Sequence, residues 1–166
     1  MPKMREMRAV DEDYPLVGPN QNTIRQPIEV PAFSLFRCLA DGPAWEEWLG
    51  LTVEWTTPEP HGVGTTRTVR GTGVKIEEYF FTWVEGELMG FRFARASMPV
   101  KAFAERYECI EVDDHACELA WSYAFEWGGA LGGVIGKVFG AVFAFKCRRA
   151  VRRLAKLLES DPARYA

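Results

Sequence analysis

The sequence predicts an α+β fold, in which a curved antiparallel sheet of about seven strands wraps around a long C-terminal helix. From Leu51 onward, apolar and polar residues alternate with a period of two, in runs bounded by glycine, proline or aspartate, as in hairpin strands. The last third changes to helical spacing, with a glycine-rich apolar stretch, Gly128 to Phe145, followed by a basic segment, Lys146 to Glu159. A sheet with one apolar face and a helix with one apolar stripe can bury these surfaces against each other.

The chain is long enough for one domain with a substantial core. It has 166 residues, of which 48% are hydrophobic and 26% are charged, as in an ordinary globular protein. Residues 1–21 are polar and contain prolines, so we expect an irregular leader there. Residues 22–160 are expected to form the single domain, and residues 161–166 a C-terminal tail.

A strand and a short helix are expected at the start of the domain. Asn22 to Val30 is expected to form the strand, and Pro27 favours an edge position or a bulge, because proline cannot donate a ladder hydrogen bond. Pro31 suits the first position of a helix, which the Asp41-Gly42-Pro43 sequence ends. The apolar face of this helix is expected to contain Phe33, Phe36, Leu39 and Ala40.

A second short helix and six strands follow. The helix carries Trp45 and Trp48, and we expect these two and Trp55 to pack a corner of the domain rather than to contact a ligand. The period-two runs predict strands at Leu51–Trp55, Thr65–Arg70, Val74–Val84, Glu87–Ala94, Val100–Val112 and Ala116–Trp127.

One stripe of the predicted long helix begins almost without side chains and ends in bulky ones. At about 100° per residue, Gly132, Gly136 and Gly140 share this stripe. It continues through Phe143, Cys147, Val151, Leu154 and Leu158. Such a face would pack firmly at one end and leave open volume at the other, as an apolar ligand requires. Alternatively, the glycines only let the helix backbone approach a neighbouring element, with no cavity. A membrane-spanning segment is a third interpretation, although the stretch is short and rich in glycine for that role.

Charge and motifs exclude several classes of function. The net charge of -3 argues against general nucleic-acid binding, since only the last helix is locally basic. The first residues lack the apolar core of a signal peptide, so a cytoplasmic location with reduced cysteines is expected. Cys109, His115 and Cys117 would supply three metal ligands without a fourth. No phosphate-binding loop and no nucleophile with a base partner is recognisable, so we expect no metal and no cofactor.

Several segments of the chain resemble a known superfamily. The sequences PAWEEWL (Pro43–Leu49), VEW (Val53–Trp55) and HGVGTTR (His61–Arg67) are similar to the polyketide cyclase/dehydrase branch of the START/Bet v1-like (SRPBCC) superfamily. The similarity continues through Glu78–Trp83, Phe103–Tyr107 and Leu119–Trp121, and covers roughly residues 22 to 158. It implies the helix-grip fold, with a deep apolar cavity between a seven-stranded sheet and the C-terminal helix. Members of the superfamily differ widely in function, so the resemblance specifies the fold better than the activity.

Alternation along the predicted strands indicates which side chains face this cavity. Arg67 and Glu78 fall among apolar neighbours on adjacent strands, where they could pair, or could act on a ligand oxygen and as a proton donor or acceptor. Tyr107, Tyr123 and the indole N–H of Trp121 could each hydrogen-bond a ligand oxygen. The catalytic candidates are Arg67, Glu78 and Tyr107. The expected ligand-binding residues are Arg67, Val69, Ile76, Glu78, Phe80, Phe91, Phe93, Phe103, Tyr107, Trp121, Tyr123, Gly136, Gly140 and Phe143.

Two main functions fit this reading. The first is noncatalytic binding or carriage of a small hydrophobic molecule such as a lipid, a quinone or a polyketide. The second is a polyketide aromatase/cyclase that works without a cofactor, as the resemblance implies for cyclases of this kind. A third hypothesis is a membrane-surface module that contacts anionic lipid through the basic residues of the last helix. A monomer or a homodimer is compatible with each of them.

Overall fold

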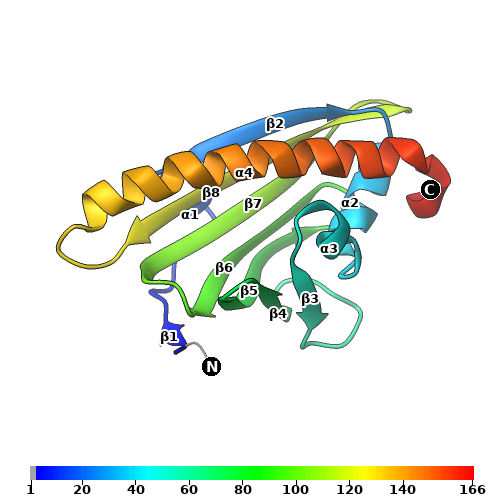
Figure 1. Cartoon of the computed structure of the whole chain (residues 1–166). Helices are drawn as coiled ribbons and strands as arrows, with labels where there is room; N and C mark the ends of the chain where they lie inside the picture. The colour runs from blue at the N-terminus through cyan, green and yellow to red at the C-terminus, as the bar shows by residue number, and fades with distance from the viewer. Residues whose placement is uncertain (1–2) are drawn as a thin grey trace.

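A curved antiparallel sheet forms one layer of the molecule, and the long helix α4 lies along one of its faces (Figure 1). The computed structural model describes residues 3–166. The sheet has the strand order β2-β8-β7-β6-β5-β4-β3, and the short strand β1 pairs with β6. The strands are β1 (Arg5–Glu6), β2 (Asn22–Ile28), β3 (Thr52–Trp55), β4 (Thr66–Gly71), β5 (Val74–Val84), β6 (Leu88–Ala96), β7 (Val100–Asp113) and β8 (Ala116–Trp127). The helices are α1 (Tyr14–Val17), α2 (Ala32–Ala40), α3 (Ala44–Trp48), α4 (Gly132–Ser160) and the 3-10 helix η1 (Pro162–Tyr165).

The predicted α+β class, and the long helix packed against the sheet, are confirmed. All strands predicted from the alternation occur, with ends shifted by two residues or fewer. Strand β2 has a neighbour, β8, on one side only, so Pro27 lies on an edge strand as its missing N–H predicted. The period-two signal was therefore sufficient for the topology of the hairpins.

The N-terminal segment is structured, so the prediction of an irregular leader was wrong. Strands β6 and β7 pair only as far as Arg92 of β6, beyond which they diverge. Strand β1 fills this gap by pairing with β6, and the N–H groups of Met7 and Arg8 donate to the carbonyl oxygens of Ala94 (2.9 Å) and Lys101 (2.8 Å). The leader thus satisfies backbone groups that the divergence would leave unpaired.

Helix α1 covers part of the sheet face that points away from α4. Its Tyr14 packs against three small residues, Ala102 and Ala104 of β7 and Ala124 of β8. Because these alanines leave a shallow hollow on the outer face, the ring can lie flat enough to be almost fully buried. The leader therefore adds a second, smaller hydrophobic cluster to the fold.

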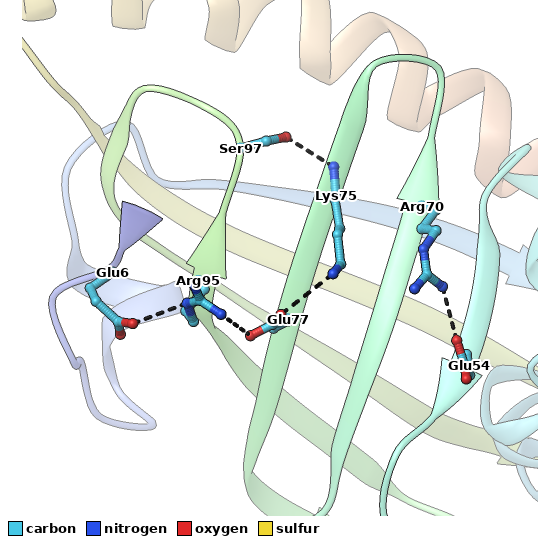
Figure 2. A network of polar contacts seen from close by, with 7 residues as sticks. All are labelled: Glu6, Glu54, Arg70, Lys75, Glu77, Arg95 and Ser97. Atoms are coloured by element: carbon cyan, nitrogen blue, oxygen red, sulfur yellow. Dashed lines mark hydrogen bonds and ion pairs between the residues drawn. The ribbon is translucent and has the colours of Figure 1, made fainter. Parts of the chain in front are cut away.

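Ion pairs cross the same outer face and connect three strands (Figure 2). The guanidinium of Arg95 on β6 lies 3.0 Å from Glu6 of β1 and 3.3 Å from Glu77 of β5. Lys75 approaches Glu77 at 3.7 Å, and its backbone N–H donates to Ser97 Oγ at 2.9 Å. Each exposed pair contributes little on its own, but together they favour the pairing of β1 with β6.

The main core lies between the other face of the sheet and helix α4. Aromatic rings dominate it: Phe103 stacks on Phe93 with ring centroids 4.4 Å apart, and Phe143 of α4 meets Tyr123 edge-on at 4.8 Å. One residue of the predicted apolar face of α2 is not in this core. Phe33 is 44% exposed, with the guanidinium of Arg37 over its ring at 4.7 Å, because this side of α2 faces outward.

The C-terminal residues are also ordered, so the predicted tail is part of the packed structure. Tyr165 of η1 donates a hydrogen bond from its hydroxyl to Asp41 at 2.6 Å. Arg164 forms a two-pronged ion pair with Glu47 of α3, at 2.6 and 3.0 Å. These contacts hold the end of α4 against α2 and α3.

None of the helices within residues 3–166 is long and apolar enough to cross a membrane. The glycine-rich half of α4 has the composition that raised this possibility, but the helix packs its glycine side against strand β8 instead. The membrane-spanning interpretation of this stretch is therefore wrong.

Candidate ligand-binding site

A cavity of about 800 Å³ lies between the sheet and helix α4. This volume falls in the range of sites for molecules of a few hundred daltons. Its walls are mainly apolar and include Val69, Ile76, Phe93, Phe103 and Trp121 from the sheet and Phe139, Phe143, Cys147 and Ala150 from α4. Exposed residues form its rim, namely Thr72 of the β4–β5 turn and Val142, Phe145, Lys146, Arg149 and Arg153 of α4. The cavity therefore communicates with the surface beside α4.

Two charged side chains are buried beside this cavity and paired with each other. Arg67 of β4 and Glu78 of β5 occupy opposed positions in the antiparallel ladder, and both point to the α4 side of the sheet. The Nε of Arg67 donates to Glu78 Oε2 at 2.5 Å, and the side chains are 0% and 5% exposed. Glu78 lines the cavity, whereas Arg67 lies behind it.

Aromatic rings surround the guanidinium of Arg67. Its carbon atom lies 4.2 Å from the ring centroid of Trp45, 4.7 Å from Phe91 and 5.0 Å from Phe80. The Nη1 and Nη2 atoms have no hydrogen-bond partner among the described residues. The positive charge is thus stabilised by one carboxylate and by the electron-rich faces of the rings rather than by a full set of hydrogen bonds.

A second buried carboxyl group, that of Glu105 on β7, lies on the cavity wall. Its Oε2 accepts hydrogen bonds from the Tyr107 hydroxyl at 2.7 Å and from the indole N–H of Trp121 at 3.0 Å. Tyr107 lies two residues after Glu105 on β7, and Trp121 is the direct partner of Tyr107 on β8. The sheet therefore places Glu105, Tyr107 and Trp121 on one face. We refer to Arg67, Glu78, Glu105, Tyr107 and Trp121 as the buried polar cluster.

The cluster contains two carboxyl groups and one permanent positive charge. Burial raises the pKa of Glu105 to about 7, and the charge of Glu78 raises it as well, while the hydrogen bond from Tyr107 opposes this. Burial also raises the pKa of Glu78, against the lowering effect of the Arg67 charge. The cluster is neutral when one carboxyl group holds a proton, so near neutral pH it can both donate and accept one.

The comparison with family models identifies the family. The model described as polyketide cyclase/dehydrase and lipid transport matches residues 22–159. The chain belongs to this family. The START-like resemblance inferred from the sequence segments is therefore confirmed.

Curated relatives of this family member carry no assigned function. Uncharacterized proteins of Mycobacterium bovis and Mycobacterium tuberculosis are 42% identical to it over 100 residues. The match covers 57% of this chain, and the chain spans 59% of the length of those relatives.

Solved structures with the same fold include members of two kinds. A START superfamily protein from Mycobacterium smegmatis has a TM-score of 0.70 at 10% identity, over 83% of this chain and 98% of its own. The Zhui aromatase/cyclase from Streptomyces sp. R1128 also has a TM-score of 0.70, at 12% identity, over 85% of this chain and 94% of its own. At such identities the likeness concerns the fold alone.

The structure of this cyclase/dehydrase and lipid transport family member separates the expected ligand-binding residues into two groups. Seven of the fourteen line the cavity: Val69, Ile76, Glu78, Phe93, Phe103, Trp121 and Phe143. The other seven are not part of its wall: Arg67, Phe80, Phe91, Tyr107, Tyr123, Gly136 and Gly140. Whether any of them contacts a ligand stays a prediction.

The polar groups expected to meet a ligand are instead engaged within the protein. The hydroxyl of Tyr123 accepts a hydrogen bond from Asn22 at 3.0 Å. The Tyr107 hydroxyl and the Trp121 indole N–H each donate a hydrogen bond to Glu105. Arg67 does not line the cavity, and its Nε donates to Glu78, which does. The strand faces were predicted correctly, since these side chains are buried, but several of them pack in the core without reaching the cavity.

The glycine stripe does not border open volume, which corrects the roles expected for Gly136 and Gly140. A Cβ atom at Gly136 would lie 3.3 Å from Trp127 Cβ, and one at Gly140 would lie 3.3 Å from Phe125 Cζ. The helix backbone therefore approaches β8 closely, as the alternative interpretation of these glycines proposed. The cavity lies further along α4, from Phe139 to Arg153.

Glu105 and Trp45 are among the residues of the site that were not singled out from the sequence. Glu105 shares the alternation of Phe103 and Tyr107, so its position on the inward face was a usable signal. Trp45 was expected to pack a corner of the domain, and it does pack on Trp48 at 4.8 Å. It also lines the cavity and covers Arg67, because α3 closes that end of the cavity. Trp45 thus packs as expected and is also part of the cavity wall, and the expectation that it does not contact a ligand stays a prediction.

Within residues 3–166, no group of three or more histidine, cysteine, aspartate or glutamate side chains is arranged to hold a metal ion. The four cysteines are unpaired and buried. Burial raises the pKa of the Cys38 thiol to about 12, so this side chain stays protonated and packs as an apolar residue.

Proposed function

We propose that this protein binds a small hydrophobic molecule in the cavity between the sheet and α4. The observation that carries the proposal is a cavity of about 800 Å³ whose walls are mostly aromatic and aliphatic but include two buried carboxyl groups. Apolar walls with a few placed polar groups are typical of ligand sites. The family description, which includes lipid transport, agrees with this reading.

The buried polar cluster favours one kind of chemical group at the end of the ligand that lies deepest in the cavity. Glu78 and Glu105 lie on the wall, and the positive charge that acts on both of them within residues 3–166, that of Arg67, is already paired with Glu78. A carboxylate or phosphate placed there would find no unpaired cation, and it would be repelled whenever Glu105 is ionised, because burial strengthens interactions between like charges. A hydroxyl or carbonyl group would be accepted, since the cluster offers both a proton donor and an acceptor. The proposed ligand is therefore apolar with a neutral oxygen at its inner end.

Native mass spectrometry of freshly purified protein tests this proposal. The mass of the native protein is compared with its denatured mass, and any released molecule is extracted into organic solvent and identified. Release of an apolar, oxygen-bearing molecule of a few hundred daltons is the expected result. If the native protein is empty, and added sterols, quinones and aromatic polyketides also fail to bind, the proposal is contradicted.

One observation favours a catalytic role as a second candidate. Glu105 combines a position on the cavity wall with a pKa of about 7, which suits a group that removes and returns a proton. In a cofactor-independent cyclase, its carboxylate would take a proton from the carbon between two ketone groups, and the resulting acid would protonate the oxygen of the carbonyl that the carbanion attacks.

The two candidates differ in what the Glu105→Gln variant does. Glutamine keeps an oxygen that accepts from Tyr107 and Trp121 but cannot take up a proton. A cyclase would lose turnover of a poly-ketone substrate by about 100-fold or more while still binding its product. A carrier would bind its ligand with little change and show no turnover before or after the substitution.

A further inference from the structure

The outward side of helix α4 has an unusual composition over its first half. α4 runs along the whole molecule (Figure 1). One side of it carries its buried residues, among them Cys147, Val151 and Leu154. Its opposite side, together with the N-cap residue, carries six large apolar residues that are 42% to 68% exposed, at helical spacing. We call these residues the apolar stripe: Leu131, Val134, Ile135, Val138, Val142 and Phe145. Scattered exposed apolar residues are ordinary, but a continuous row of them marks an interaction surface.

The second half of the same helix is strongly basic. We call its six cations the basic patch: Lys146, Arg148, Arg149, Arg152, Arg153 and Lys156. All six are exposed, and none forms an ion pair with another residue of the part of the chain that the structure describes. Because the whole protein has a net charge of -3, this positive surface is a local feature and not a general property.

The stripe and the patch meet at the rim of the cavity. Val142 and Phe145 belong to the stripe, Lys146, Arg149 and Arg153 belong to the patch, and all five line the cavity. Whatever covers this side of α4 therefore lies against the opening through which a ligand passes.

We infer that α4 binds the surface of an anionic lipid bilayer, with the apolar stripe in the headgroup region and the rim turned toward the lipid. A helix that lies in a membrane interface needs apolar residues on one side and cations that reach the phosphates. Here both lie along one straight helix of 29 residues, about 43 Å long at 1.5 Å per residue. A row of exposed cations without ion pairs to the described residues complements a continuous array of negative headgroups.

The bilayer contact rests on the surface of α4 alone. The direction of loading, from the bilayer through the rim into the cavity, rests in addition on the proposed function. The two parts are separated by measuring vesicle binding and ligand binding independently on the same protein.

Vesicle flotation tests the membrane contact. The protein of 166 residues is mixed with vesicles of phosphatidylcholine alone, or of phosphatidylcholine with about one third phosphatidylglycerol. Each cation near the surface strengthens binding to the second, anionic kind of vesicle. We expect binding to the anionic vesicles, weakened by salt, and little binding to the neutral ones. The variant Arg149→Glu/Arg153→Glu should lose about tenfold or more in affinity. Val134→Ser/Val138→Ser, which leaves the cavity wall unchanged, should lose about fivefold.

Matched controls exist elsewhere on the chain. Lys3→Glu/Arg5→Glu changes the net charge by the same amount, from -3 to -7, and both residues are exposed away from α4. Val63→Ser/Val112→Ser removes two valines that are each 66% exposed, close to the 66% and 62% of Val134 and Val138. Both controls should bind vesicles within about twofold of the unchanged protein.

Three results would overturn the inference. The first is equal binding to neutral and anionic vesicles, or to neither. The second is a loss of binding in the controls as large as in the α4 variants. The third is a dimer in light scattering that becomes a monomer on Val134→Ser/Val138→Ser, since a second copy of the chain would then cover the stripe.

Discussion

Arg67 and Glu78 face each other across β4 and β5 as a buried ion pair, joined by a hydrogen bond of 2.5 Å from Nε to Oε2. Neither side chain has appreciable contact with solvent. The pair stands between the aromatic core and the cavity, so it fixes the polarity of the cavity wall. Because both charges are buried, the stability of the fold depends on Arg67 and Glu78 neutralising each other.

Replacing only the acid of this pair should destabilise the fold. Glu78→Gln leaves the Arg67 charge buried without its carboxylate, and we expect the free energy of unfolding to fall by about 3 to 5 kcal/mol. Urea denaturation followed by tryptophan fluorescence measures this. The double variant Arg67→Met/Glu78→Leu removes both charges and should be within about 2 kcal/mol of the unchanged protein. Equal losses in the two variants would mean that packing, and not charge, is the cause.

Glu105 should make stability depend on pH between about 4.5 and 7. Its pKa is raised from 4.5 to about 7 by burial, so in this range the folded protein holds a proton that the unfolded chain has released. Stability is therefore highest below pH 4.5, as far as this group is concerned, and falls as pH rises toward 7, by about 3 kcal/mol for the full shift. Glu105→Gln cannot titrate and should flatten the profile. Urea midpoints at intervals of pH give both curves, and parallel curves would contradict this assignment.

Filling the cavity should remove ligand binding without unfolding the protein. Val69 lines the cavity and is 2% exposed, so Val69→Phe would extend a ring into the free volume. Binding of an environment-sensitive apolar dye should weaken by about tenfold or more, because part of its buried surface is lost. Val112→Phe makes the same change at a site 66% exposed and should leave dye binding unchanged. Unaltered binding in Val69→Phe would show that the dye lies elsewhere.

Two adjacent glycines at the start of α4 should respond oppositely to alanine. A Cβ atom at Gly132 would lie 2.7 Å from the carbonyl oxygen of Trp127, whereas one at Gly133 meets nothing within 4 Å. Gly133→Ala should stabilise the protein by about 0.5 to 1 kcal/mol through helix propensity, and Gly132→Ala should destabilise it. Thermal unfolding of the two variants measures the difference. Equal melting temperatures would mean that this end of α4 does not hold its position against β8.

The sequence alone was sufficient for the fold and for the faces of the strands. Alternation placed Arg67 beside Glu78 because side-chain direction in a strand depends only on parity, which local sequence contains. The structure of the leader was not predicted because it depends on non-local contacts. Strand β1 has two residues and exists because β6 and β7 diverge, which is a property of distant segments.

The position of the cavity was harder to predict than its existence. Whether a glycine on α4 borders free volume or another backbone depends on how far the helix stands from the sheet, and no local pattern records that distance. Gly140 illustrates this, since the ring of Phe125 occupies the space that the missing side chain leaves. Likewise, Trp45 reaches the cavity only because α3 folds over its end.

The cavity divides its two tasks between separate parts of the chain. All five members of the buried polar cluster come from strands, whereas five of the six rim residues come from α4. Substitutions on the exposed side of α4 can thus change the size or charge of the opening while the hydrogen-bonded groups on the sheet keep their geometry. For protein engineering, this makes access and chemistry two independent design variables, and libraries confined to Val142, Phe145 and Arg149 would vary only the first.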